Sequence, residues 1–183
     1  VPVNYGLVPK SFLLQNIGEG QFIDSTPPEL SRAGMITSGV WNDLNQDGYP
    51  ELMLVGEWMS LITFLNEGGQ LKANRKTPNS TGWWSKLAAK DLDQDGDLDL
   101  IAGNWGENSP FNATPDEPLE MYVKDFDQNG KTEFIINWYP PQEHVAYPFG
   151  TKKTIIETLG TTNTTCVLCL HGFKLHPFLT LLY

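Results

Sequence analysis

Cysteine and basic residues are scarce in this chain of 183 residues, and each scarcity excludes a class of protein. The two cysteines, Cys166 and Cys169, lie near the end, so the preceding core must be held by packing or by metal ions rather than by disulfides. Lys and Arg number 12 against 22 Asp and Glu, which gives a formal charge of -10. Because such a chain repels phosphate backbones, we expect no nucleic-acid partner.

Long apolar runs are also missing. No run reaches the roughly 20 residues that cross a bilayer, so we expect no membrane span, and no signal peptide opens the sequence. Residue 1 is Val, and the first residues are strand-like. We interpret the chain as a fragment of a longer protein, in which a removed export signal would be invisible. Hydrophobic residues at 40% and charged residues at 19% are ordinary for a globular protein.

Short apolar segments separated by polar turns recur along residues 1–150, without a sustained period of 3.6 residues. Residues 27–34 contain Pro27, Pro28 and Gly34 and are expected to form a loop. Two simple hairpins are predicted, made by 11–16 with 21–26 and by 60–65 with 70–74. The pattern predicts an all-β architecture, either a sandwich or a propeller.

Three acidic turns between predicted strands share the pattern D-x-[DN]-x-[DN]-G-x-x-[DE]. They recur at unequal intervals, which is typical of a repeat whose outer loops vary in length, and the repeat favours a propeller. Numbering each turn from its first Asp, positions 1, 3, 5, 7 and 9 are Asp43, Asn45, Asp47, Tyr49 and Glu51; Asp91, Asp93, Asp95, Asp97 and Asp99; and Asp125, Asp127, Asn129, Lys131 and Glu133.

This pattern supplies the ligands of Ca²⁺, a hard ion that takes six to eight oxygens at roughly 2.3–2.6 Å. Positions 1, 3 and 5 of a tight loop direct side-chain oxygens to one centre, and glycine at position 6 permits the backbone to reverse. Position 7 contributes its carbonyl, so its side chain is free to vary, and position 9 closes the site with a carboxylate. A solvated acidic turn is the alternative, but three turns in register predict up to three calcium ions.

Carboxylate number distinguishes the three loops. The second loop has four carboxylates among its expected side-chain ligands, Asp91, Asp93, Asp95 and Asp99, whereas the other two have three each. Because affinity rises with ligand charge, we expect the second site to bind calcium most tightly.

An EF-hand is the obvious alternative for such loops. It requires a bidentate Glu at position 12 and helices on both sides. Position 12 is apolar in each loop, namely Leu54, Ala102 and Ile136, and the following residues are strand-like. The sequence therefore excludes an EF-hand and favours loops between β-strands.

The loops and their strands resemble the FG-GAP and VCBS repeats of integrin-α-type β-propellers, most strongly in LAAKDLDQDGDLDLIAGNWG at 87–106. A narrower resemblance, to bacterial proteins related to cartilage acidic protein (ASPIC/UnbV-associated), covers about residues 1–150. Its segments are SFLLQNIGEGQFIDST, VGEWMSLITFLNEGG, GWWSKLAAKDLDQDGDLDLIAGNWGENS and EPLEMYVKDFDQNG. The resemblance implies a secreted, surface or periplasmic propeller with calcium between neighbouring strands of a blade. It also implies binding or adhesion to a protein or glycan, without catalysis.

Three repeats do not close a propeller, which typically has about 4–8 blades. Residues 1–150 are therefore expected to form about three blades of a larger ring, whose exposed edges invite aggregation. Residues 151–183 form an atypical apolar tail, which we hypothesise to be non-native or frameshifted. Zinc at Cys166-x-x-Cys169 with His171 and His176 is disfavoured, because a second ligand pair usually lies roughly 12–20 residues away.

Six tryptophans are expected to pack between wedge-shaped blades, with carbohydrate stacking as the alternative: Trp41, Trp58, Trp83, Trp84, Trp105 and Trp138. His144 lies beside Glu143, where a base role is conceivable, but an exposed loop histidine is the simpler interpretation. The chain has no recognisable nucleophile elbow, serine triad or phosphate-binding loop. We therefore expect no catalytic residues.

The leading hypothesis is a calcium-stabilised binding module of an exported protein. The first alternative is that these blades accompany a catalytic domain elsewhere in the full protein. The second is a calcium-responsive switch, although β-strands on both sides of each loop argue against a large opening.

Overall fold

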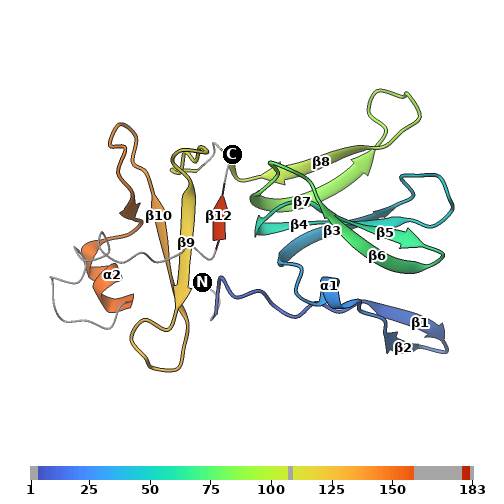
Figure 1. Ribbon diagram of the computed structural model, residues 1–183, viewed down its shortest axis with the longest axis horizontal. Coiled ribbons are helices and arrows are strands. Elements are labelled where there is room, and N and C mark those ends of the chain that lie inside the picture. The colour runs from blue at the N-terminus through green and yellow to red at the C-terminus, as the bar shows by residue number, and fades with distance from the viewer. Residues whose placement is uncertain (1–3, 107–108, 159–178, 182–183) are drawn as a thin grey trace. The chain divides into compact units, whose positions relative to one another are not determined.

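Strands dominate the computed structural model, which describes residues 4–106, 109–158 and 179–181 (Figure 1). The described residues form twelve strands and two short helices, so the expected all-β class is confirmed. The chain divides into two compact units, each described below by itself. One comprises Val8–Trp105, and the other comprises Val1–Leu7 with Gly106–Tyr183.

The Val8–Trp105 unit begins with the first predicted hairpin. Strand β1 (Leu14–Gly18) pairs antiparallel with β2 (Gln21–Asp24), which confirms that prediction. Helix α1 (Pro28–Ser31) follows, so the expectation of a loop over residues 27–34 was wrong in part. Proline is compatible with the first turn of a helix because its missing N–H would have no intrahelical partner there. The burial of Leu30 fixes this turn against the core.

Four strands then pair antiparallel in chain order: β3 (Met35–Asn42), β4 (Glu51–Met59), β5 (Ile62–Glu67) and β6 (Gln70–Lys76). The β5–β6 pair is the second predicted hairpin, which is therefore confirmed. Its turn contains Gly68 and Gly69, both at positive φ. A four-stranded antiparallel meander of this kind is the unit from which a propeller blade is made.

The sheet continues beyond this meander. Strands β7 (Gly82–Lys90) and β8 (Asp99–Asn104) form another antiparallel hairpin, and β7 also pairs with the end of β4, where Glu57 lies opposite Trp83. Trp58 interrupts this pairing as a bulge and has a φ of 59°. The bulge places its ring 5.2 Å from that of Trp83, which in turn lies 4.6 Å from Trp105. These three tryptophans therefore pack on one another inside the unit.

Strand β4 is the centre of this unit because both of its faces are covered. Leu52 and Leu54 pack on one face with Ile62 and Phe64, whereas Met53 on the other face packs near Leu87. Alternation of side chains along a strand explains the division. Each fully buried side chain of this size contributes about 1.5–3 kcal/mol relative to an exposed one, so β4 fixes the positions of β3, β5 and the loops that join them.

The second unit contains a smaller sheet in the order β11-β10-β9-β12. Its strands are β9 (Leu119–Lys124), β10 (Glu133–Trp138), β11 (Tyr147–Pro148) and β12 (Leu179–Leu181). Helix α2 (Lys152–Thr158) places Ile155 against Ile135 of β10. Among the described residues, no helix is long and apolar enough to cross a membrane. Cys166, Cys169, His171 and His176 lie outside the described residues, as does most of the tail.

Candidate calcium loops

The three acidic loops occupy equivalent places in their units. They join β3 to β4, β7 to β8 and β9 to β10, each time between two antiparallel neighbours. The strand register places position 9 opposite the residue before position 1: Glu51 faces Asn42, Asp99 faces Lys90, and Glu133 faces Lys124. The hairpin itself therefore brings the two ends of each loop together.

The backbone of the three loops follows one course. Position 6 is glycine at positive φ, with values of 87° at Gly48, 98° at Gly96 and 86° at Gly130. Position 4 also has positive φ, although it is glutamine each time: 59° at Gln46, 64° at Gln94 and 60° at Gln128. Position 4 was not identified from the pattern of acidic residues, yet the repeated glutamine was visible in the sequence.

Position 1 is held by the backbone of its own loop. One carboxylate oxygen of each first Asp accepts the N–H of the position 6 glycine. These distances are 2.8 Å for Asp43 and Gly48, 3.1 Å for Asp91 and Gly96, and 2.8 Å for Asp125 and Gly130. The bond turns the carboxylate toward the interior of the loop in all three cases.

Position 9 is held in a matching way, by the N–H of position 2. The N···O distances are 2.9 Å for Leu44 and Glu51, 3.0 Å for Leu92 and Asp99, and 2.9 Å for Phe126 and Glu133. One oxygen of each carboxylate is used in this bond. This hydrogen bond fixes the orientation of the carboxylate, and the second oxygen does not take part in it.

Two loops bring three carboxylates together. One oxygen each from Asp91, Asp93 and Asp99 lie within 4.8 Å of one another, and Asp125, Asp127 and Glu133 form the same group in the third loop. Asp95 instead accepts the N–H of Asp97 at 3.1 Å. In the first loop position 3 is Asn45, and the described residues bring no three carboxylates together there. Its amide oxygen accepts the N–H of Asp47 at 3.0 Å.

Glu51 supplies a separate observation for the first loop. Its side chain is only 1% exposed, and its Oε1 has no hydrogen-bond partner among the described residues. A buried carboxylate oxygen without a partner is strongly unfavourable. Because the other oxygen is fixed by Leu44 at the loop, a bound cation is a chemically suitable partner for Oε1. The donor set of this loop therefore fits calcium.

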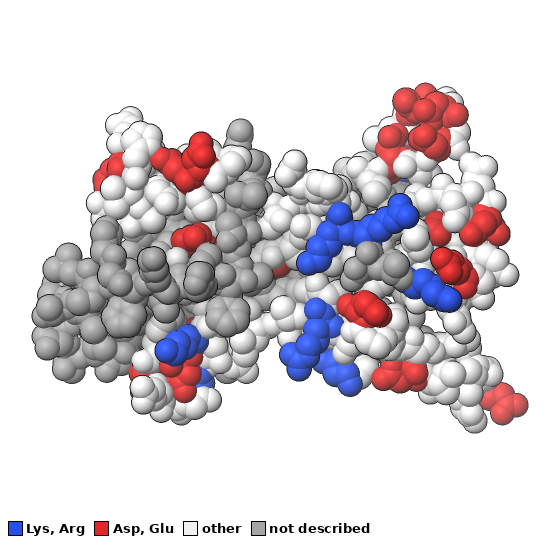
Figure 2. All heavy atoms as spheres, viewed as in Figure 1, with Lys and Arg blue, Asp and Glu red and all other residues white. Residues whose placement is uncertain are grey.

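The side chains at position 7 are consistent with a site in which this position would bind the ion only through its backbone carbonyl. Tyr49, Asp97 and Lys131 all have exposed side chains. Coulombic repulsion from Asp95, followed by a hydrogen bond to it, raises the pKa of Asp97 above its usual value. Figure 2 shows acidic side chains gathered at the tip of the β7–β8 hairpin, at the upper right. The acidic side chains at this tip therefore repel one another.

His144 is not part of these loops. Its side chain is 82% exposed, as expected for a loop histidine, and its Nδ1 is hydrogen-bonded to Glu117 rather than to its neighbour Glu143. This exposed contact contributes little to stability. It offers no nucleophile or buried base around which a catalytic site could be built.

Comparison with known families gives a match to part of the chain. Residues 43–102 match the model of the FG-GAP-like repeat. The match begins at the first Asp of the first loop, includes the whole second loop and ends within β8. The third loop lies outside the match but has the same backbone course and the same hydrogen bonds. Neither a curated protein nor a solved structure matches the chain.

Proposed function

We propose that this chain is a calcium-binding β-propeller module of an exported protein, in which calcium is structural and the blades bind a protein or a glycan. The observation that carries the metal assignment is the recurrence of one loop geometry three times, with a carboxylate fixed at both ends of each hairpin tip. Oε1 of Glu51, which has no hydrogen-bond partner in the part of the chain that the structure describes, supports it independently. The FG-GAP-like match and the β3–β6 meander support the propeller.

Calcium would be held by the side chains of positions 1, 3, 5 and 9 and by the carbonyl of position 7. It would neutralise the acidic side chains and tie the two strands of each hairpin together. At about 100 times its Kd, an ion adds roughly 2.7 kcal/mol to the free energy of unfolding. Such a gain corresponds to roughly 5–10 °C in the melting temperature of a chain of this size. Calcium is abundant outside cells, so even weak sites would be filled there.

Thermal melting with increasing calcium tests the metal assignment. We expect the melting temperature to rise with calcium, and we expect Asp91→Ala combined with Asp95→Ala to reduce the rise. Magnesium at the same concentration should act more weakly, because it demands a smaller octahedral site. Asp116→Ala serves as the control, because Asp116 is exposed and lies outside the loops. A melting temperature that does not change with calcium concentration would refute the metal assignment.

The second candidate is that these blades accompany a catalytic domain in a longer protein. The sequence contains no recognisable catalytic constellation, and His144 lies exposed beside Glu117. The complete reading frame would decide between the two, because the second candidate requires a catalytic domain encoded in the same chain.

A further inference from the structure

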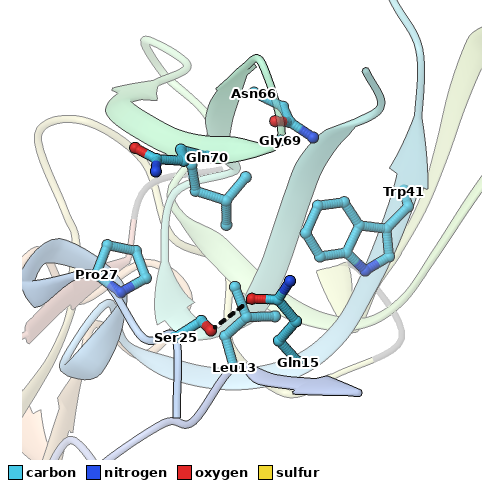
Figure 3. Close-up of a pocket in the computed structure, with 9 residues that line it drawn as sticks. Leu13, Gln15, Ser25, Pro27, Trp41, Asn66, Gly69 and Gln70 are labelled. Atoms are coloured by element: carbon cyan, nitrogen blue, oxygen red, sulfur yellow. Dashed lines mark hydrogen bonds between the residues drawn. The ribbon is translucent and has the colours of Figure 1, made fainter. Parts of the chain in front are cut away.

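A cavity of about 480 Å³ opens in the Val8–Trp105 unit, beside the β1–β2 hairpin and strands β3, β5 and β6 (Figure 3). This volume lies in the range of roughly 300–1,000 Å³ that is typical of small-molecule sites. The cavity is distinct from the three acidic loops, since none of the side chains at positions 1 to 9 lines it. It therefore requires its own explanation.

The polar groups of the cavity are all uncharged. They are the amides of Gln15, Asn66 and Gln70 and the hydroxyl of Ser25. The remaining lining residues are apolar or glycine, so no carboxylate or ammonium group of the described residues faces the space. In a chain with 22 acidic residues, this neutral lining favours a ligand that has many hydrogen-bonding groups and no charge.

Trp41 provides an open apolar surface. Its side chain is 46% exposed although it belongs to a sheet strand, and Figure 3 shows its ring on one side of the cavity with Gln70 on the other. Large aromatic rings are usually covered, because each can bury about 150–250 Å² of surface. The flat face of an indole ring matches the C–H face of a pyranose, whose hydroxyl groups then point outward to polar side chains.

Asn66 has an acceptor that the protein does not use. The side chain is 8% exposed, its Nδ2 donates to the Pro50 carbonyl at 2.8 Å, and its Oδ1 has no partner among the described residues. Because the Nδ2 bond fixes the amide, the free oxygen cannot be satisfied by a flip. The oxygen is closed off from solvent, so it lies behind the wall of the cavity, and Asn66 shapes that wall rather than offering an acceptor to the open space.

Gln15 is oriented as well. The hydroxyl of Ser25 donates to its Oε1 at 3.1 Å, as the dashed line in Figure 3 shows. This bond occupies the oxygen and leaves the Nε2 hydrogens as donors. The cavity thus combines a flat apolar face with an oriented amide donor, and the two together can bind the C–H and hydroxyl surfaces of a sugar.

We propose that this cavity binds a neutral carbohydrate. The ring of Trp41 stacks on the sugar, and the amides of Gln15 and Gln70 contact its hydroxyl groups. This inference rests on the proposed binding module and assigns it a ligand class. A neutral peptide is the competing occupant, and the test below distinguishes it from a sugar.

The test uses the full 183-residue chain in calcium. Saturation-transfer NMR and calorimetry would measure binding of glucose, galactose, mannose, N-acetylglucosamine and their neutral oligosaccharides. We expect at least one sugar to bind and Trp41→Ala to weaken its binding by about tenfold, the loss of one stacking contact. Trp41→Phe should restore part of the affinity, and Gln70→Ala should weaken binding without a change in folding. Phe22→Ala is the matched control, because Phe22 is 59% exposed and lies outside the cavity.

Three results would overturn the proposal. The first is that no neutral sugar binds to the folded protein, and the second is that binding is unaffected by both Trp41→Ala and Gln70→Ala. Binding of a neutral peptide pool through Trp41 in place of sugars would also reject it. The calcium melting shift is measured separately on each variant, so a failed sugar titration with an intact shift rejects the cavity assignment alone. If a sugar binds but the melting temperature does not change with calcium, only the metal assignment is rejected.

Discussion

Glu51 and Leu44 are joined across the first acidic loop by a hydrogen bond of 2.9 Å from the backbone N–H to Oε2. The same bond links positions 2 and 9 of the other two loops. Only in the first loop is the position 9 side chain fully buried, with a second oxygen that has no partner among the described residues. This difference makes Glu51 the most informative single residue for the metal proposal.

Replacing Glu51 by glutamine should lower the calcium affinity of the first loop by about tenfold, because a charged ligand is lost from the site. In EDTA the variant should melt no lower than the wild-type protein, since a neutral amide is easier to bury than a carboxylate. Calorimetric titration and thermal melting measure the two effects. Glu19→Gln, at an exposed turn position, is the control.

A different pair of results for Glu51→Gln would contradict the metal proposal for the first loop. An unchanged calcium isotherm together with a lower melting temperature in EDTA would mean that the carboxylate only supports the Leu44 N–H. The first loop would then be a hairpin turn rather than a metal site.

Two glycines separate the effect of backbone conformation from that of steric overlap. Gly96 has positive φ, and the space that a Cβ would occupy there is open, so Gly96→Ala should lower the free energy of unfolding by about 1 kcal/mol. At Gly56 a Cβ would overlap the carbonyl oxygen of Met35 on the paired strand β3, so Gly56→Ala should cost about 3 kcal/mol or more. Urea unfolding in EDTA measures both, and equal losses would contradict this assignment.

Asp97→Asn should raise the melting temperature in calcium-free buffer at neutral pH. Repulsion from Asp95 raises the pKa of Asp97, so the folded protein holds this proton more tightly than the unfolded chain does. Stability is therefore lost as the pH rises through the raised pKa, and asparagine removes the loss. The difference between variant and wild type should disappear below the ordinary pKa of 3.8.

Melting curves across this pH range, with Asp116→Asn as the matched control, test the effect. Asp116 is exposed and outside the acidic loops, so its replacement should leave the curves unchanged. If Asp97→Asn melts like the wild type at neutral pH without calcium, then the acidic side chains of this loop do not destabilise the folded state.

Phe64→Ala should destabilise the Val8–Trp105 unit by about 3–5 kcal/mol, because its ring is buried against Leu52 and Leu54. Phe22→Ala removes a ring of the same size from an exposed position and should change stability by less than about 0.5 kcal/mol. Urea unfolding of the two variants checks the location of the core. Similar losses for both would place the core elsewhere.

The hairpins and the acidic loops were predictable because their signals are local. Alternating apolar residues, glycine-containing turns and the spacing of Asp43, Asn45 and Asp47 all lie within a few residues of one another. The positive φ at Gln46 was not predicted, because glutamine has no special preference for that conformation. The loop imposes it: the N–H of Asp47, next in the chain, must reach Asp43 at 3.1 Å.

The cavity was not predictable in this way. Trp41 and Asn66 come together because β4 pairs with β3 and with β5, and Gln15 reaches the same cavity from the separate β1–β2 hairpin. Helix α1 was missed for a related reason. Its single turn depends on the burial of Leu30 against Leu54 and Met59, and no helical period can be recognised in four residues.

The hydrogen bonds of the second acidic loop have a practical consequence for protein engineering. The N–H groups of Leu92, Gly96 and Asp97 donate to carboxylates between Asp91 and Asp99, and none of these bonds leaves the nine-residue segment. Because these hydrogen bonds stay within the segment, its conformation should depend on the host protein only for two antiparallel strands in the right register. We therefore expect residues 91–99 to be transplantable, so that replacing the turn of an unrelated β-hairpin with them would carry the proposed oxygen donors into a new host.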